Sequence, residues 1–253
     1  MINSISIGSI TIYFYSLCIL LGVLVAYFII TKEAIKNNIT ENDILNILFY
    51  GMLIGIIGAR IYYVVFNLDY YSNNISDIYK VWKGGLAIHG GIILGSIFAY
   101  WYSKKKNIDF IKLMDIILPG VIIAQGIGRW GNFFNQEAYG MMVSKELLEK
   151  LLIPKFVIKG MNIGGNYHLP TFYIESIFCI IGFIIMIILR KKEVKKGLIT
   201  AFYMIWYGTL RCIIEYFRTD SLMFFNMKIA MLVSIILIIF GVVLFIKSMR
   251  SKE

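Results

Sequence analysis

The sequence predicts an all-α protein, a polytopic bundle of helices that crosses a membrane several times. Hydrophobic residues make up 59% of the 253 residues, and the mean hydropathy is +0.76, whereas soluble domains are about 45–50% apolar. Apolar runs of about 20 residues recur, and each can cross a hydrocarbon layer of about 30 Å. No Pro- or Ser-rich linker divides the chain, so we expect residues 1–253 to form a single integral membrane domain.

About seven segments meet this length requirement, and they lie near residues 10–31, 44–66, 85–103, 111–134, 171–189, 198–217 and 226–246. The second contains Gly51-x-x-x-Gly55 and the third contains Gly91-x-x-x-Gly95. This spacing of small residues lets membrane helices pack closely. Residues 135–170 form the longest connection, so we expect a small external cap between the fourth and fifth spans.

Basic residues set the expected orientation. The chain carries a formal net charge of +10, and its lysines and arginines gather after the first, third, fifth and seventh segments. By the positive-inside rule these connections are cytoplasmic, which places the N-terminus outside and the C-terminus inside. Topology and anionic lipid therefore explain the charge, and we expect no nucleic-acid partner. Residues 1–4 lack a basic region, so we also expect no cleaved signal peptide.

Charged and polar side chains interrupt the apolar segments, and a charge at the bilayer centre costs roughly 2.5–3.5 kcal/mol. Such residues usually face a protein interior or a water-filled cavity. Given the expected orientation, most fall in the outer half of their spans, which predicts a polar cavity open to the outer leaflet. They are Tyr15, Arg60, His89, Arg129, Asn132, Glu175, Arg211 and Glu215.

The sixth segment places Tyr207, Arg211, Glu215 and Arg218 on one helical face, at i, i+4, i+8 and i+11. Arg211–Glu215 and Glu215–Arg218 can pair along the helix. Internal neutralisation of buried charge is one interpretation, but it leaves more positive charge than carboxylate. The excess favours an anionic ligand such as a phosphate, which Arg129 and Arg211 would clamp because a guanidinium donates two parallel hydrogen bonds.

Two further residues allow more than one interpretation. Arg60 could assist the clamp or extend to the membrane interface. His89 lies between Gly84-Gly85 and Gly90-Gly91, and it could be a hydrogen-bonded core residue or a proton acceptor near neutral pH. Its depth matches that of the arginines and favours function. His168 lies in the predicted cap without a matched partner, which favours a structural role.

Residues 126–140 match G-x-G-R-x-G-N-F-x-N-x-E-x-x-G at every fixed position. This pattern resembles the signature of bacterial prolipoprotein diacylglyceryl transferases. The resemblance covers nearly the whole chain, because it includes Tyr15, the Gly58-Ala59-Arg60 run, the region of His89 and the pattern around Arg211. One motif departs: the family commonly has H-P-[ST]-Q-L-Y-E before the fifth span, where this chain has L-P-T-F-Y-I-E at residues 169–175. Roles of that histidine and glutamine therefore do not transfer.

The resemblance implies transfer of diacylglyceryl from phosphatidylglycerol to the lipobox cysteine of an exported prolipoprotein signal peptide, at the outer face of the bacterial cytoplasmic (inner) membrane. A thioether forms and glycerol phosphate leaves, and no metal or cofactor is expected. His89 is then the leading base, or it orients the base, while Arg129 and Arg211 bind the phosphate. Tyr207 is the fourth predicted catalytic residue and would contribute a hydroxyl hydrogen bond. The other substrate-binding residues would be Tyr15, Arg60, Asn132, Glu137, Gly140, Glu215 and Arg218.

Two alternatives belong to other functional classes. A transporter or channel for an anionic solute would place polar residues through the full membrane thickness and often show repeated halves. A lipid-binding protein without turnover would bind phosphatidylglycerol and tolerate replacement of His89. The apolar cytoplasmic halves and the residue-by-residue motif match favour the enzyme over both.

Overall fold

The structure, a computed structural model, describes residues 3–8, 10–219, 223–224 and 227–250. It contains two compact units. The large unit comprises Met1–Ile30 with Met114–Glu253, and the small unit comprises Thr31–Leu113. The expectation of a single domain stays a prediction. Two expectations fall partly outside the described residues: the seventh span, predicted to begin at residue 226, and the absence of a signal peptide, which was inferred in part from residues 1–2.

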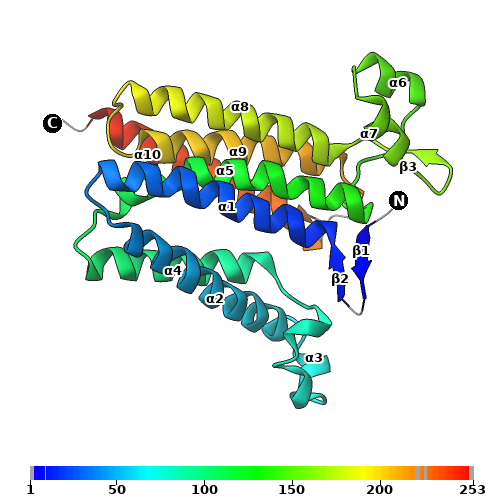
Figure 1. Ribbon diagram of the computed structural model, residues 1–253, viewed down its shortest axis with the longest axis horizontal. Helices are drawn as coiled ribbons and strands as arrows, with labels where there is room; N and C mark the ends of the chain where they lie inside the picture. Colours follow the sequence, from blue (N-terminus) through cyan, green and yellow to red (C-terminus); the bar gives the residue numbers. More distant parts are fainter. Residues whose placement is uncertain (1–2, 9, 220–222, 225–226, 251–253) are drawn as a thin grey trace. The chain divides into compact units, whose positions relative to one another are not determined.

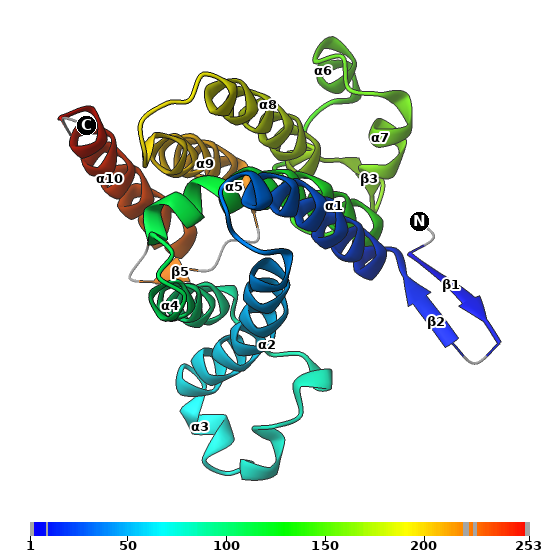
Figure 2. The same ribbon diagram turned by 60° about the vertical axis from the view of Figure 1, so that its left-hand side comes forward.

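Long helices dominate the large unit, where α1, α5, α8, α9 and α10 run side by side (Figures 1 and 2). Three two-stranded antiparallel hairpins accompany them, which the all-α expectation did not include. The elements are β1 (Ser4–Ile7), β2 (Ile10–Tyr13), α1 (Phe14–Lys36), α5 (Phe110–Asn135), α6 (Lys145–Lys150), α7 (Lys155–Gly160), β3 (Asn162–Ile163), β4 (Asn166–Tyr167), α8 (Thr171–Lys191), α9 (Leu198–Phe217), β5 (Met223–Phe224), β6 (Met227–Lys228) and α10 (Ile229–Arg250).

The small unit is a helix pair with a connecting loop. It contains α2 (Glu41–Val65), α3 (Leu68–Tyr71), the 3-10 turns η1 (Ile75–Asp77) and η2 (Val81–Lys83), and α4 (Ile88–Lys105). Thr40 caps α2, since its hydroxyl accepts from the backbone N–H of Asp43 at 3.2 Å. The predicted glycine packing is confirmed: a Cβ on Gly55 would lie 3.5 Å from the carbonyl oxygen of Gly91. The two helices therefore meet backbone to backbone.

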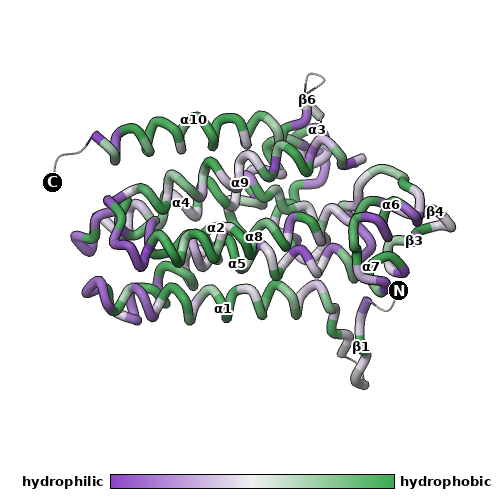
Figure 3. Tube along the Cα trace, turned by 90° about the horizontal axis from the view of Figure 1, so that it is seen from above, coloured by the Kyte–Doolittle hydropathy of each residue, from purple (hydrophilic) through white to green (hydrophobic). Residues whose placement is uncertain are grey.

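Among the described residues, five helices are long and apolar enough to cross a membrane by length and composition: α1, α2, α5, α8 and α10. Each is hydrophobic along most of its length, and hydrophilic residues gather near the ends (Figure 3). These helices indicate a multi-pass membrane protein. The predicted third and sixth spans, α4 and α9, are helices of 18 and 20 residues. They are less apolar because they contain the charged and polar residues discussed above.

Close packing in the large unit depends on small residues. A Cβ on Gly126 of α5 would lie 3.0 Å from the Cβ of Cys179, so α5 and α8 approach closely at this level. Near the opposite ends of these helices, Asp115 fixes the start of α9. Its carboxylate accepts from the backbone N–H of Gly197 at 2.6 Å and of Thr200 at 2.8 Å. The packing at Gly126 therefore positions α8 against α5, and the hydrogen bonds of Asp115 position the first turn of α9 against α5.

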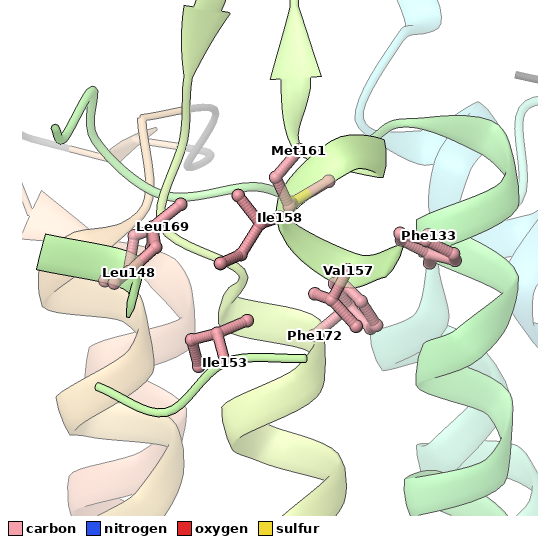
Figure 4. Close-up of a cluster of buried hydrophobic side chains, with 8 residues drawn as sticks. All are labelled: Phe133, Leu148, Ile153, Val157, Ile158, Met161, Leu169 and Phe172. Carbon is pink, nitrogen blue, oxygen red and sulfur yellow. The ribbon is translucent and has the colours of Figure 1, made fainter. Parts of the chain in front are cut away.

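The connection between α5 and α8 forms a small cap with its own hydrophobic core (Figure 4). Ser144 caps α6 through a hydrogen bond from the N–H of Leu147 at 3.2 Å, and Pro154 precedes α7. The buried core residues are Phe133, Leu148, Ile153, Val157, Ile158, Met161, Leu169 and Phe172. The predicted compact cap is therefore present, and its placement outside the membrane stays a prediction.

Candidate active site

A buried carboxylate joins two arginines in the large unit. Glu175, near the start of α8, is 2% exposed. Its Oε1 lies 2.8 Å from Nη2 of Arg129 on α5, and its Oε2 lies 3.3 Å from Nη1 of Arg211 on α9. Three helices thus contribute one charged side chain each to a single contact. We call Arg129, Glu175, Tyr207, Arg211 and Glu215 the polar cluster.

Residues on one face of α9 complete the polar cluster. Nη2 of Arg211 lies 2.7 Å from Oε2 of Glu215, so the pairing expected from their i, i+4 spacing is present. Tyr207 donates from its hydroxyl to Oε1 of Glu175 at 3.3 Å and accepts from Nη2 of Arg129 at 3.4 Å. The Tyr203 ring stacks on the Tyr207 ring at 5.8 Å between centroids. Tyr207 is therefore held against both charged groups.

The charge balance differs from the sequence expectation. Spacing on α9 suggested more positive charge than carboxylate, whereas the polar cluster contains two guanidinium groups and two carboxylates. The second carboxylate, Glu175, comes from another helix and neutralises charge that α9 alone leaves uncompensated. Buried charges need such partners because desolvation costs several kcal/mol per ion. Positive excess therefore does not by itself argue for an anionic ligand.

Hydrogen-bonding capacity makes the stronger argument. The Nε atom of Arg129 is buried and has no hydrogen-bond partner among the described residues. Its Nη1 reaches Oδ1 of Asn132 only at 3.5 Å, close to the limit for a hydrogen bond. A buried donor left unsatisfied costs about 1–3 kcal/mol. An acceptor oxygen brought by a ligand would remove this penalty.

A second set of predicted residues extends from Arg129 towards the cap. Asn132 donates through Nδ2 to Oε1 of Glu137 at 2.9 Å, and the N–H of Glu137 donates to the carbonyl of Asn132 at 3.0 Å. Ala138 has a φ of 55°, and its carbonyl accepts from the hydroxyl of Thr171 at 2.5 Å. The turn after α5 is therefore fixed by α8, and it presents Glu137 next to Asn132.

Backbone and packing contacts involve Gly140, Arg218 and Tyr15. Gly140 pairs with Arg218 in an isolated β-bridge, and a Cβ on Gly140 would lie 3.0 Å from the Cβ of Leu169. Lys228 donates to the carbonyl oxygen of Arg218 at 2.9 Å, at the end of α9. Tyr15 of α1 packs on α5, because a Cβ on Gly131 would lie 2.6 Å from its ring. These contacts leave no room for larger residues at Gly131 or Gly140.

His168, predicted to be structural, is buried in the cap. Its Nδ1 lies 3.1 Å from the carbonyl oxygen of Gly140, and its ring centroid lies 4.4 Å from that of Tyr139. Its backbone N–H donates to the carbonyl of Met161 at 3.0 Å. These contacts hold the segment that contains Gly140 against the cap.

His89 is the second residue of α4 in the small unit. Its half-buried ring lies 6.2 Å from the Tyr62 ring, centroid to centroid. The start of α4 is fixed to α2, since the N–H of Ala87 donates to the carbonyl of Ala59 at 3.0 Å. Gly58 and Gly90 approach so closely that a Cβ on Gly58 would lie 2.5 Å from the carbonyl oxygen of Gly90. The glycines beside His89 therefore serve helix packing. Convergence of His89 with the polar cluster stays a prediction.

Arg60 makes contacts that neither expectation from the sequence described, and its assistance to the clamp stays a prediction. It is 6% exposed, so its guanidinium is turned into the protein and does not extend away from it. Its guanidinium donates to four backbone carbonyl oxygens and lies 5.3 Å from the centre of the Tyr71 ring. The acceptors are Asp77 at 2.6 Å, Ile78 at 2.7 Å, Gly84 at 2.7 Å and Gly85 at 2.9 Å. Arg60 thus organises the loop that leads into the helix of His89.

The Asp77 side chain makes further contacts within the same loop. Its carboxylate accepts from the Tyr70 hydroxyl at 2.9 Å and from Nζ of Lys80 at 2.6 Å. Hydrogen bonding to this carboxylate raises the pKa of Tyr70 and the pKa of Lys80, because it stabilises the protonated form of each group. The loop between α3 and α4 is therefore held by side chains from within it and by Arg60 of α2.

Glu175 is the main residue to which the sequence assigned no catalytic or substrate-binding role, although it was predicted to be one of the polar groups of the cavity. The sequence placed it at the outer end of the fifth span but gave it no partner. Helical spacing reveals pairs within one helix only, so contacts of Glu175 with α5 and α9 had no signal in the spacing. Its retention, together with Pro170 and Thr171, in the partly altered 169–175 motif was the available hint.

A hydrocarbon-lined groove lies on other faces of α8 and α9. It has a volume of about 470 Å³, and no member of the polar cluster lines it. Its walls include Phe178, Phe202 and Phe245. The residues that line the groove include no charged side chain, and their polar groups are the Thr209 hydroxyl and the Trp206 indole N–H, so the polar cluster remains the candidate for chemistry.

Comparison with known proteins agrees with the motif resemblance. A family model described as prolipoprotein diacylglyceryl transferase matches residues 3–247. The chain is 45% identical over 253 residues to the phosphatidylglycerol–prolipoprotein diacylglyceryl transferase of Streptococcus uberis, covering 98% of this chain and 95% of that protein. Proteins of the same name are 44% identical in Streptococcus pneumoniae, covering 98% and 94%, and in Streptococcus equi subsp. zooepidemicus, covering 100% and 97%.

Replacing Glu175 tests its bridging position. Glu175→Ala leaves two buried guanidinium groups without a shared partner, so we expect the free energy of unfolding in detergent to fall by about 3–5 kcal/mol. Glu137→Ala is the matched control, because Glu137 is exposed and its loss is expected to cost less than about 1 kcal/mol. Equal effects of the two substitutions would contradict the bridging role.

Replacing Arg60 tests its contacts with the loop. Arg60→Lys retains the charge but cannot reach four carbonyl groups, so amide hydrogen exchange at residues 77–87 should become at least about tenfold faster. One charged hydrogen bond contributes about 1.5–3 kcal/mol, and roughly 1.4 kcal/mol corresponds to tenfold. The control Lys80→Gln removes a partly exposed ion pair and should change exchange much less. Unchanged exchange in Arg60→Lys would show that the loop is held by other contacts.

Proposed function

The chain belongs to the prolipoprotein diacylglyceryl transferase family, and on this premise we propose that it transfers diacylglyceryl from phosphatidylglycerol to the lipobox cysteine of exported prolipoproteins. The bond between the glyceryl carbon and the phosphate oxygen breaks, and a thioether forms between that carbon and the cysteine sulfur. Glycerol phosphate leaves with the electron pair, and the thiol proton passes to a base. The reaction is the first step of lipoprotein maturation, and it needs neither a metal nor a cofactor.

The observation that carries this proposal is the incomplete hydrogen bonding of Arg129. Its Nη2 binds Glu175, while its buried Nε has no partner among the described residues. Glu175 fixes the guanidinium in place, so the remaining donors are oriented before a ligand arrives. A phosphate oxygen is a suitable acceptor, because charged hydrogen bonds to guanidinium are short and strong. Negative charge that develops on the departing phosphate is stabilised by donors that need not reorganise.

The other residues then take complementary roles. Arg211 is oriented by both Glu175 and Glu215 and supplies a second positive charge. Tyr207 contributes a hydroxyl beside Arg129, and Tyr15 contributes another from α1. Asn132 and Glu137 shape the headgroup site with Gly140 and Arg218, because the turn after α5 joins them by hydrogen bonds. Arg60 acts on the substrate site only through the loop before His89.

His89 is proposed as the base that receives the thiol proton, or as the residue that orients this base. A cysteine thiol has a pKa of about 8.5, so only a few per cent is thiolate at neutral pH. A base near the thiol therefore raises the reactive fraction. The support is the position of His89 at the beginning of α4, where α2 and the Arg60 loop fix the backbone.

We also propose the full topology: seven spans in the bacterial cytoplasmic membrane, with the N-terminus outside and the C-terminus inside. This topology adds α4 and α9 to the five apolar helices. The last turn of α4 contains Lys104 and Lys105. The polar cluster and the cap then face the outer side, where an exported precursor presents its lipobox. Neighbouring helices shield the charged residues of α9 from lipid.

The alternative is a transporter or lipid-binding protein for an anionic solute or headgroup. Both would use the Arg129 donors, but neither forms a covalent product. Mass spectrometry of a lipobox peptide incubated with the purified protein and phosphatidylglycerol separates them. We expect a diacylglyceryl adduct together with released glycerol phosphate.

Substitution of Arg129 tests the phosphate contact in the same assay. Arg129→Lys retains the charge but removes the planar donor edge, so kcat/KM for phosphatidylglycerol should fall at least about 100-fold, the range seen when one preorganised donor is lost. Lys191→Gln, an exposed substitution at the end of α8, is the control and should behave as wild type. Full activity of Arg129→Lys would exclude a specific guanidinium–phosphate contact.

Substitution of His89 tests the base. His89→Gln should lower kcat by about 100-fold or more, since general-base catalysis contributes about 10²–10⁴-fold. The remaining activity should rise with pH as the substrate thiol ionises without assistance. Retained activity with the wild-type pH profile would remove His89 from proton transfer and leave it a structural residue of α4.

A further inference from the structure

The cap presents apolar side chains that its own core does not cover. Leu147 and Leu151 lie one turn apart on α6 and its C-cap, and Leu152 and Phe156 follow them. All four are exposed, and Leu152 is 88% exposed. We call these four residues the cap surface. Their neighbours Leu148 and Ile153 are buried in the cap core, so the cap surface is not part of that core.

Backbone geometry adds to this observation. Leu152 has a φ of 55°, a conformation that side-chain-bearing residues adopt infrequently. The turn places Ile153 inside the cap and leaves Leu152 outside. An apolar residue at an exposed left-handed position gains nothing for the isolated fold, where Gly or Asn is favoured. The residue type therefore points to a contact made outside this chain's own core.

We propose that the cap surface inserts into the interfacial layer of the anionic membrane in which the long helices lie. The cap is attached directly to the end of α5 and the start of α8, so it lies at the bilayer boundary. Among the core residues labelled in Figure 4, Ile153 lies on the side towards which the long helices continue. In the sequence, Ile153 directly follows the Leu151–Leu152 turn.

Charge around the cap surface selects the occupant. Lys150 and Lys155 are exposed and flank the Leu151–Leu152 turn. Glu149 is paired with Lys145 at 3.4 Å and Glu146 lies beside Leu147, so the uncompensated positive charge is at the Leu151–Leu152 end of the cap surface. Lysines beside exposed leucine and phenylalanine side chains are typical of segments that lie in an anionic lipid interface. The apolar side chains enter the upper acyl region, and the ammonium groups remain among the lipid phosphates.

Anchoring the cap would also steady the candidate site. Gln136 donates through Nε2 to the carbonyl of Gly160 at 3.0 Å, so α7 contacts the turn that contains Glu137. The Phe156 ring stacks near the Trp130 ring at 6.2 Å, and Trp130 donates to the Ser176 hydroxyl at 3.1 Å. A membrane contact at Phe156 therefore reaches both α5 and α8. The inference concerns membrane contact and does not depend on the transfer reaction.

Depth-dependent fluorescence quenching tests the proposal in the full chain, reconstituted in phosphatidylglycerol vesicles. An environment-sensitive label is attached at Leu152→Cys after Cys18, Cys179 and Cys212 are replaced by alanine. The matched control is Asn166→Cys on β4, an exposed position in the hairpin that projects from the cap away from the long helices (Figure 1). We expect shallow spin-labelled lipids to quench the label at 152, and aqueous iodide to quench only the label at 166.

Charge is tested by combining Lys150→Gln with Lys155→Gln, which should reduce lipid quenching at 152 in phosphatidylglycerol vesicles but not in neutral phosphatidylcholine vesicles. Iodide quenching at 152 equal to that at 166 would overturn the proposal. Protection from both quenchers would also overturn it, because a protein would then cover the cap surface. A change at 152 that requires added prolipoprotein would assign the surface to the precursor instead.

Discussion

The charged contact at Glu175 is the interaction on which the large unit depends. A carboxylate that is 2% exposed is held between two guanidinium groups from other helices. Removing any one of the three charges would leave another buried without compensation, which costs several kcal/mol. The contact therefore acts as a constraint: α5, α8 and α9 can occupy only arrangements that bring all three groups within hydrogen-bonding distance.

Close helix packing makes this constraint possible. Gly126 lies one turn before Arg129, and it lets α8 approach α5 at the level of Cys179 and Ser176. Glu175 is the residue before Ser176, so the same close approach of α8 to α5 brings its carboxylate within 2.8 Å of Arg129. Towards the other end of α5, Asp115 accepts hydrogen bonds from Gly197 and Thr200 at the start of α9, which fixes the position of α9 along α5. Small residues fix the separation of the helices, and the polar contacts fix their register.

The sequence indicated much of this arrangement, because its signals are local. Apolar length indicated the long helices, and α9 spans Leu198–Phe217, the predicted range. Its spacing also indicated the Arg211–Glu215 pair. Long-range partners had no comparable signal: the role of Glu175 depends on two other helices, and Arg60 binds backbone carbonyl groups, which every residue possesses. Residues 10–13 were predicted as the start of the first helix, but Ile10–Tyr13 form β2 and α1 begins at Phe14. An apolar run does not by itself show where a strand ends and a helix begins.

Two arginines of this chain differ in how completely the fold satisfies their hydrogen-bond donors. Arg60 and Arg129 both interrupt apolar helices, so hydropathy and spacing treat them alike. The Arg60 guanidinium donates to four carbonyl oxygens fixed in one loop, and an incoming anion would have to compete with all of them. Arg129 is oriented on one side by Glu175, while its buried Nε lacks a partner among the described residues. The phosphate contact proposed for Arg129 would therefore not have to displace a hydrogen bond from Nε. Buried arginines in membrane helices are therefore better assigned by counting the donors that the fold leaves unsatisfied than by counting their charges.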